Sequence, residues 1–221
     1  MLMPEQFGLY LILTRPVAGY ERCAEAAVAA GVRYLQLRMK DEPPTRILET
    51  ARHLRALTAG TNTRFIVNDD PDLAAEVGAD GVHLGQDDEP LLAARARHPE
   101  IKFWGLSTHD EKQATEAIAL RPTYIGVGPV FRTPTKAKPD PVLGLVRLER
   151  ILRATPLTAV AIGGINEENL ADVLSAGAVN FAVVRAVCDH PDPASAIRRL
   201  QEIWRSFQGE AGGGVSAAGG R

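Results

Sequence analysis

Residues that could bind an anion gather in the stretch GPVFRTPTKAKPDPVLG, residues 128–144. It carries the hydroxyls of Thr133 and Thr135 and the cationic groups of Arg132, Lys136 and Lys138, in a chain of formal net charge −2. Ammonium, guanidinium and hydroxyl groups donate strong hydrogen bonds to phosphate oxygens. Taken alone, the stretch is also typical of a proline-rich surface loop with solvated lysines, so the other polar positions decide between the two interpretations.

Polar side chains end several other short apolar runs of the sequence. Lys40 follows YLQLRM, Asn68 and Asp69 follow RFIV, Asp88 follows GVHLGQD, and Ser107 ends FWGLS. Two carboxylates on neighbouring loops suit Mg²⁺, which takes one or two carboxylates and completes its shell with substrate phosphate oxygens. Each of these stretches is also an ordinary helix N-cap sequence, and both roles stay open.

The last two apolar runs end in segments that favour phosphate binding by the backbone. AIGGI places Gly163 and Gly164 before a helix start, and VVRA, residues 183–186, ends the eighth run. Backbone N–H groups at these positions often bind phosphate in (β/α)8 barrels. His83 lies inside a run and is expected to be a satisfied core or rim histidine, while His109 lies on the rim. We find no nucleophile elbow, dinucleotide fingerprint or His/Cys metal spacing.

The elements that must position these residues alternate along the chain. Eight short apolar runs are separated by Ala/Leu/Glu/Arg-rich segments of helical spacing. Such alternation predicts a parallel sheet, and eight repeats favour a single-domain (β/α)8 TIM barrel, an α/β fold, over an open doubly wound sheet. Gln36, Arg38 and Lys40 alternate with apolar neighbours, so a barrel would direct this polar row toward its interior and its mouth.

Composition narrows the class of protein further. The 221 residues are 45% hydrophobic, which is enough to form one large hydrophobic core. We assign residues 1–207 to a single barrel domain and expect the Gly/Ala-rich tail 208–221 to be disordered. The two cysteines, Cys23 and Cys188, cannot form a disulfide framework and favour the cytoplasm. We find no signal peptide or membrane span in the sequence. The 25 basic and 27 acidic residues nearly balance, so the chain has no overall positive potential that would attract nucleic acid.

The motifs together resemble one known family. QLRMK, VNDDPDLAAEVGADGVHLGQDD, GLSTH, YIGVGPVFRTPTKAK, AIGGI and VVRAV occur in the order found in the thiamine phosphate synthase family, over residues 8–207. The resemblance implies a (β/α)8 barrel that joins hydroxymethylpyrimidine diphosphate to hydroxyethylthiazole phosphate with Mg²⁺, giving thiamine phosphate and diphosphate by a dissociative route. The absence of an evident nucleophile or base on the rim agrees with that chemistry.

The resemblance also implies a role for each matching residue. Gln36, Arg38 and Lys40 would meet the pyrimidine diphosphate, Asn68 its phosphates, and Asp69 and Asp88 the Mg²⁺. Ser107 and Lys136 would hold the diphosphate as the catalytic candidates, and Thr133, Thr135, Gly164 and the backbone of Val184 and Arg185 would hold the thiazole phosphate. The sequence departs from the family pattern at Arg132, where Pro is usual, and at Arg185, where Ser is common.

Two other functions fit parts of the pattern. A thiazole tautomerase, a related barrel that moves a proton on a thiazole phosphate carboxylate, would not need a diphosphate site, whereas Lys40, Asp69, Asp88 and Lys136 are all present. A non-catalytic phosphate-binding barrel would be expected to lose the two carboxylates. We therefore expect a transferase acting on small phosphorylated substrates, with no nucleic-acid or membrane partner, and the sequence is compatible with a homo-oligomer.

Overall fold

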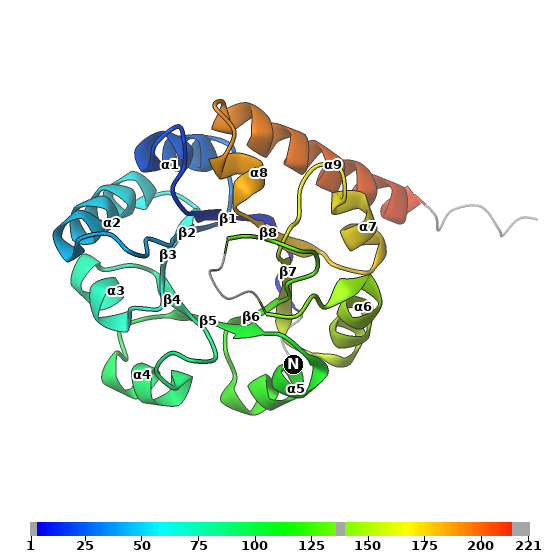
Figure 1. Cartoon of the computed structure of the whole chain (residues 1–221), viewed down its shortest axis with the longest axis horizontal. Coiled ribbons are helices and arrows are strands. Elements are labelled where there is room, and N and C mark those ends of the chain that lie inside the picture. The colour runs from blue at the N-terminus through cyan, green and yellow to red at the C-terminus, as the bar shows by residue number, and fades with distance from the viewer. Residues whose placement is uncertain (1–3, 136–139, 214–221) are drawn as a thin grey trace, which may run out of the picture.

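The computed structural model describes residues 4–135 and 140–213 and forms a closed barrel of parallel strands in chain order (Figure 1). The strands are β1 (Gly8–Leu13), β2 (Tyr34–Leu37), β3 (Arg64–Asn68), β4 (Gly81–Leu84), β5 (Phe103–Thr108), β6 (Tyr124–Val127), β7 (Thr158–Ile162) and β8 (Asn180–Val183). Because β1 pairs with β8, the barrel is confirmed and the open sheet is wrong.

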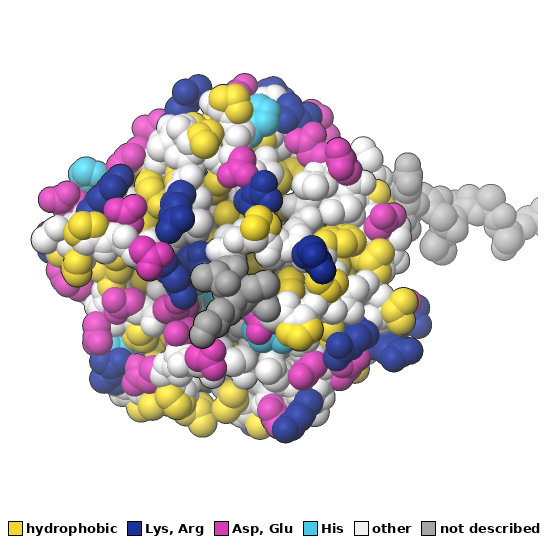
Figure 2. Space-filling view, viewed as in Figure 1, with side chains coloured by type: hydrophobic (Ala, Val, Ile, Leu, Met, Phe, Trp, Pro, Cys, Tyr) yellow, Lys and Arg dark blue, Asp and Glu magenta, His cyan; other side chains and the backbone are white. Residues whose placement is uncertain are grey.

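Helices follow the strands and surround the barrel (Figure 1). They are α1 (Tyr20–Ala29), α2 (Pro44–Thr58), α3 (Pro71–Val77), α4 (Leu91–Arg97), α5 (Glu111–Leu120), α6 (Gly144–Ala154), α7 (Leu170–Ser175), α8 (Arg185–Cys188) and α9 (Pro193–Gly213). None of the helices in the described part of the chain is long and apolar enough to cross a membrane. On the face shown in Figure 2, basic and acidic side chains are interspersed.

The alternation of side chains along the strands produces two apolar layers. Leu9, Leu11 and Leu13 of β1 pack in the large layer beneath the helices, whereas Tyr10 and Ile12 lie in a smaller cluster inside the barrel. This is the two-residue period of a strand with one side toward helices and the other toward the barrel axis. The inner layer is aromatic and polar, so it can carry a hydrogen-bonded network.

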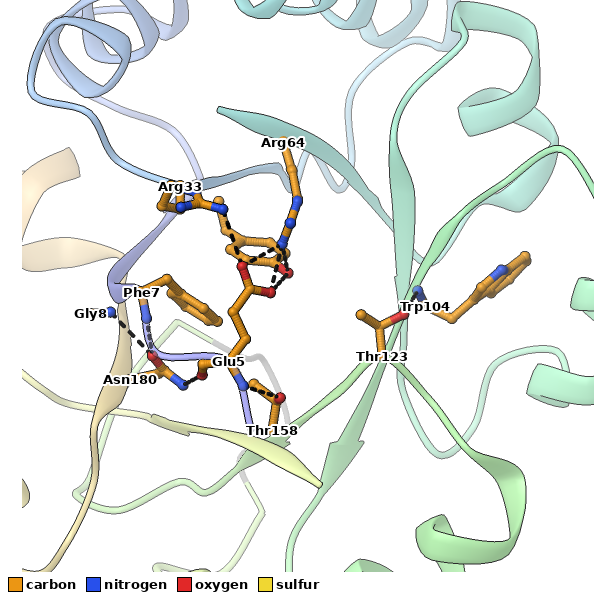
Figure 3. A network of polar contacts seen from close by, with 10 residues as sticks. Glu5, Phe7, Gly8, Arg33, Arg64, Trp104, Thr123, Thr158 and Asn180 are labelled. Atoms are coloured by element: carbon orange, nitrogen blue, oxygen red, sulfur yellow. Dashed lines mark hydrogen bonds and ion pairs between the residues drawn. The ribbon is translucent and has the colours of Figure 1, made fainter. Parts of the chain in front are cut away.

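A network of polar contacts closes the N-terminal end of the barrel (Figure 3). The Glu5 carboxylate accepts hydrogen bonds from Arg33, Arg64 and Tyr34, and the Glu5 N–H donates to Thr158. The buried Asn180 side chain accepts from the N–H groups of Phe7 and Gly8 at 2.7 and 3.1 Å. The segment before β1 therefore covers this end, which leaves the C-terminal end for a site.

Two sequence expectations about element ends differ from the structure. The eighth apolar run, NFAVVRAV at residues 180–187, predicts one strand, but β8 ends at Val183 and α8 begins at Arg185. A short apolar run does not distinguish a strand from a buried helical turn, which is why the boundary was misplaced. At the C-terminus α9 extends to Gly213, past the start of the tail 208–221 that the sequence predicts to be disordered, and residues 214–221 lie outside the described residues.

Candidate active site

A cavity of about 490 Å³ opens among the C-terminal ends of the strands. Its floor includes Ile12, Gly126, Ile162 and Ala182 from the inner side of the barrel. The residues named in the sequence analysis that line it are Gln36, Arg38, Asn68, His83, Ser107, His109, Arg132, Thr133, Thr135, Gly163, Gly164, Val184 and Arg185. Residues from six strand ends thus meet in one cavity of the size that holds a small organic ligand.

The polar side chains of β2 and of the residue after it point toward the barrel interior and its mouth, as the alternation along the strand predicted. Gln36 is buried inside the barrel, while Leu35 and Leu37 pack beneath the helices. Arg38 follows the strand end and lines the cavity. Burial lowers the pKa of Arg38, and the nearby Asp69 carboxylate acts in the opposite direction. A guanidinium group that is partly removed from water binds an anion more strongly than a solvated one.

Two carboxylates and a lysine form a cluster beside Asn68 on the rim. The Lys40 ammonium lies 2.7 Å from Asp69 Oδ2, and the side chains of Asp69 and Asp88 are hydrogen-bonded to each other. Asp88 also accepts a hydrogen bond from the Gly85 N–H at 2.6 Å. Asp69 has a φ of 64°, a left-handed conformation that costs free energy for a non-glycine residue and is concentrated at functional sites.

The two carboxylates have different proton affinities. Burial and the hydrogen bond with Asp69 both raise the pKa of Asp88. Burial also raises the pKa of Asp69, but its hydrogen bonds with Lys40 and Asp88 outweigh that effect and lower its pKa overall. Two adjacent carboxylates repel each other unless a proton or a cation lies between them.

This pair fits the magnesium ion that the family resemblance implies. The described residues hold no group of three or more His, Cys, Asp or Glu side chains that could form a complete protein cage for a metal. Mg²⁺ is commonly bound through one or two carboxylates together with substrate phosphates. Asp69 and Asp88 are therefore the residues that would hold it, close to the cavity.

Helix capping, the alternative role for these stretches, falls on neighbouring residues. Asp70, not Asp69, caps α3 by accepting from the Leu73 N–H at 2.9 Å. Asp110, not Ser107, caps α5 by accepting from the Gln113 N–H at 2.8 Å. Each of these two stretches can therefore cap a helix with one residue and place another polar residue at the rim.

A chain of hydrogen bonds that the sequence did not indicate runs beneath the cavity. Gln36 Nε2 lies 2.7 Å from the Tyr10 hydroxyl, which lies 2.8 Å from the Tyr124 hydroxyl. Tyr124 lies 3.2 Å from His83 Nδ1, and His83 Nε2 lies 2.9 Å from Ser107 Oγ. The inward parity of these positions on their strands is the signal that could have found the network.

The loops after β6 and β7 pack closely against each other. Thr133 and Thr135 line the cavity with their hydroxyls 3.0 Å apart. Gly163 has a φ of 100°, and a Cβ there would lie 2.5 Å from Pro129 Cα, while a Cβ on Gly164 would lie 2.8 Å from the Arg132 carbonyl oxygen. Gly163 and Gly164 are thus required for the close packing of these two loops, in addition to any contact with phosphate. Lys136, and with it Lys138, lies outside the described residues.

Arg185 lies at the cavity edge as the first residue of α8. Its Nε donates to Asp189 Oδ2 at 2.8 Å, and its side chain is 57% exposed. The first N–H groups of a helix have no acceptor within the helix, so the start of α8 offers backbone donors to the cavity. The side chain of Arg185 is therefore directed to Asp189, and its backbone N–H lies at the cavity edge.

His109, the rim histidine, is held by the loop after β6. Its Nδ1 lies 2.6 Å from the Gly128 carbonyl oxygen, so Nδ1–H donates to that oxygen. Its Nε2 lies 3.5 Å from Asp140 Oδ2. His109 lines the cavity, and the contacts on both of its ring nitrogens hold the ring in place as part of the wall.

Fold and site together define the class of protein, an enzyme barrel with an anion-binding cavity and an acidic pair at the C-terminal mouth of its strands. Residues 9–187 match the model of the thiamine monophosphate synthase family. The chain belongs to this family.

Individual relatives agree with the family match. The chain is 41% identical to the thiamine-phosphate synthase of Archaeoglobus fulgidus over 86% of this chain and 89% of the relative. It is 40% identical to that of Anaeromyxobacter dehalogenans over 93% and 91%. Among solved structures, thiamine phosphate pyrophosphorylase from Pyrococcus furiosus has a TM-score of 0.83 and 33% identity, covering 91% of this chain and 96% of that one.

Proposed function

We propose that this protein is a thiamine-phosphate synthase, which transfers the pyrimidinylmethyl group of hydroxymethylpyrimidine diphosphate to the nitrogen of hydroxyethylthiazole phosphate. The observation that carries the proposal is the cavity at the barrel mouth, where guanidinium, hydroxyl and glycine groups meet beside an acidic pair. These groups match two phosphorylated ligands, and the family membership supports the same chemistry.

The diphosphate would lie on the side of the cavity formed by β2, β3 and β5. Arg38, Asn68 and Ser107 line that side, and Lys40 lies beside Asp69 on its rim. Mg²⁺ held by Asp69 and Asp88 would supply positive charge to the departing diphosphate. Donors placed in advance stabilise charge as it develops on a leaving group, which is the main contribution required from this site.

The carbon left behind by the diphosphate needs a dry, aromatic-sized site and no catalytic base. Ile12, Ile162 and Ala182 form apolar walls of the cavity, which would keep water from a pyrimidine-stabilised methylene cation. Gln36 also lines the cavity and would orient the pyrimidine ring. The thiazole nitrogen is itself the nucleophile, so the protein has only to position it.

The thiazole phosphate would lie on the opposite side, at the ends of β6, β7 and β8. Thr133 and Thr135 offer hydroxyls there, and Gly164 and the start of α8 offer backbone N–H groups. Lys136, which lies outside the described residues, would hold the diphosphate together with Ser107. The two ligands would then approach each other across the cavity.

The reaction would take place in the cytoplasm as part of thiamine biosynthesis. Cys23 and Cys188 are both free and buried, and burial raises the pKa of Cys23 to about 11 and that of Cys188 to about 12. Protonated, buried thiols are typical of structural cysteines in a reducing compartment.

An assay with both substrates and Mg²⁺ tests the proposal. We expect thiamine phosphate and diphosphate to form together, and omission of either substrate to abolish both products. A thiazole tautomerase would instead leave the pyrimidine diphosphate intact while converting a carboxylated thiazole phosphate, so that outcome would overturn the transferase assignment.

A further inference from the structure

The hydrogen-bonded chain beneath the cavity has a direction that follows from its end group. The Gln36 amide nitrogen has no lone pair to accept with, so it donates to the Tyr10 hydroxyl. Tyr10 and Tyr124 each have a single hydroxyl proton, and their oxygens are 2.8 Å apart. Because Gln36 donates, the acceptor that the described residues offer to the Tyr10 proton is the Tyr124 oxygen, and the Tyr124 proton is then directed to His83 Nδ1.

This order determines which nitrogen of His83 carries its proton. When the ring carries a single proton, Nδ1 accepts from Tyr124, so that proton lies on Nε2 and is donated to Ser107 Oγ. Ser107 Oγ then accepts a hydrogen bond from His83, and the hydroxyl proton of Ser107 is left for a partner on the cavity side. Ser107 is further fixed through its carbonyl oxygen, which accepts from Gln86 Nε2 at 2.5 Å.

We propose that the chain Gln36–Tyr10–Tyr124–His83 holds His83 as the Nε2–H tautomer and thereby presents the Ser107 hydroxyl proton to the departing diphosphate. This inference rests on the proposed function, and it makes His83, Tyr124 and Tyr10 positioning residues. Gln36, the residue at the pyrimidine side, and Ser107, the residue at the diphosphate side, are then joined by one directional network.

Burial supports this network. Tyr10 and Tyr124 are fully buried, and burial raises the pKa of both well above the ordinary value, so both hydroxyls keep their protons. The two rings pack edge to face with centroids 5.6 Å apart, and His83 stacks on Tyr124 at the same separation. Networks of this kind in a low dielectric polarise along their length and hold one arrangement.

Tyr124 allows a test that leaves the cavity walls unchanged, because the described cavity lining includes His83 and Ser107 but neither tyrosine. Tyr124→Phe removes one hydroxyl and keeps the ring. Tyr34→Phe is the matched control: its ring packs 5.5 Å from that of Tyr124, but its hydroxyl binds Glu5 and Arg64 at the other end of the barrel.

The first measurement is the tautomer of His83 in ¹⁵N-histidine-labelled protein without substrates, from two-bond ¹H–¹⁵N correlations above neutral pH, with the signal assigned by His83→Gln. We expect the Nε2–H tautomer in the wild type and in Tyr34→Phe, and its loss or mixing in Tyr124→Phe. An Nδ1–H tautomer in the wild type would show that the chain runs the other way and would overturn the proposal.

The second measurement is steady-state synthesis of thiamine phosphate. We expect Tyr124→Phe to lower kcat about 10-fold, less than the loss of a whole donor, with both KM values within about threefold of wild type. Tyr34→Phe should keep the wild-type kcat. A Tyr124→Phe variant with an altered tautomer and an unchanged kcat would overturn the proposal; if it does not fold, Tyr10→Phe interrupts the same chain one step earlier. If the wild type makes no thiamine phosphate, the proposed function fails while the tautomer result still stands.

Discussion

Adjacent residues in one short motif have separate tasks in this protein. In NDDP, Asp70 caps α3, whereas Asp69 lies against Lys40 and Asp88 at the rim. The sequence placed both carboxylates at a strand end but could not separate the helix cap from the candidate metal ligand, because an aspartate can serve as either. The left-handed φ of 64° at Asp69 is what turns it away from the helix, and backbone strain is not visible in a sequence.

Asp69→Asn should lower turnover by on the order of 10²-fold, because it removes a charge that would hold Mg²⁺ in a preorganised site. The matched control is Asp70→Asn, which makes the same change on the next residue, and Asn caps helices as well as Asp does. We expect that control to retain wild-type turnover. Undiminished wild-type activity in excess chelator would contradict the metal role.

Arg185→Ser should change the KM for thiazole phosphate by less than about 10-fold, the limit set by loss of one charge-assisted hydrogen bond. The side chain is directed to Asp189, so the phosphate would be held by backbone N–H groups that serine also supplies. Steady-state kinetics with varied thiazole phosphate provide the measurement. A much larger rise in KM with unchanged turnover would identify the guanidinium as a phosphate ligand.

At the scale of elements, the strands were predicted in number and order but not in length. Each apolar run was expected to continue toward its polar end, yet β2 stops at Leu37 and β8 at Val183. Lys40 and Arg185 therefore lie beyond the ends of their strands, whereas Asn68 and Ser107 are still paired within β3 and β5. What fixes the loops is mutual packing, as at Gly163 against Pro129, and contacts between distant segments have no periodicity to reveal them.

Gly163→Ala should lower the free energy of unfolding by about 2 to 4 kcal/mol, since it combines left-handed strain with a Cβ that would lie 2.5 Å from Pro129 Cα. Gly60→Ala is the matched control, with a φ of 74° and nothing within 4 Å of the added Cβ. We expect it to cost about 1 kcal/mol. Urea unfolding measures both, and equal losses would show that the loop contact does not contribute.

At the scale of the whole molecule, the barrel's closure follows from the alternation of strands and helices, and the polar row of β2 indicated it correctly. The closing network at the other end was not predictable, because Glu5 and Asn180 lie 175 positions apart in the chain. Tyr34, Arg64, Thr158 and Asn180 are each the first residue of a strand, so only the closed barrel brings them together (Figure 3).

Asn180→Ala should lower the free energy of unfolding by about 2 to 4 kcal/mol, because the N–H groups of Phe7 and Gly8 would lose their buried acceptor. Asp192→Ala, which removes a polar side chain at the exposed start of α9, is the control and should cost about 1 kcal/mol. Chemical denaturation compares the two. A loss at Asn180 no greater than at Asp192 would contradict the structural role of this network.

The transferase function is tested most directly by the stoichiometry of the reaction catalysed by the wild-type protein with hydroxymethylpyrimidine diphosphate, hydroxyethylthiazole phosphate and Mg²⁺. We expect one diphosphate to be released for each thiamine phosphate formed, and neither product to form when Mg²⁺ is chelated. Conversion of a thiazole substrate while the pyrimidine diphosphate stays intact, or no conversion of either ligand by folded protein, would contradict it.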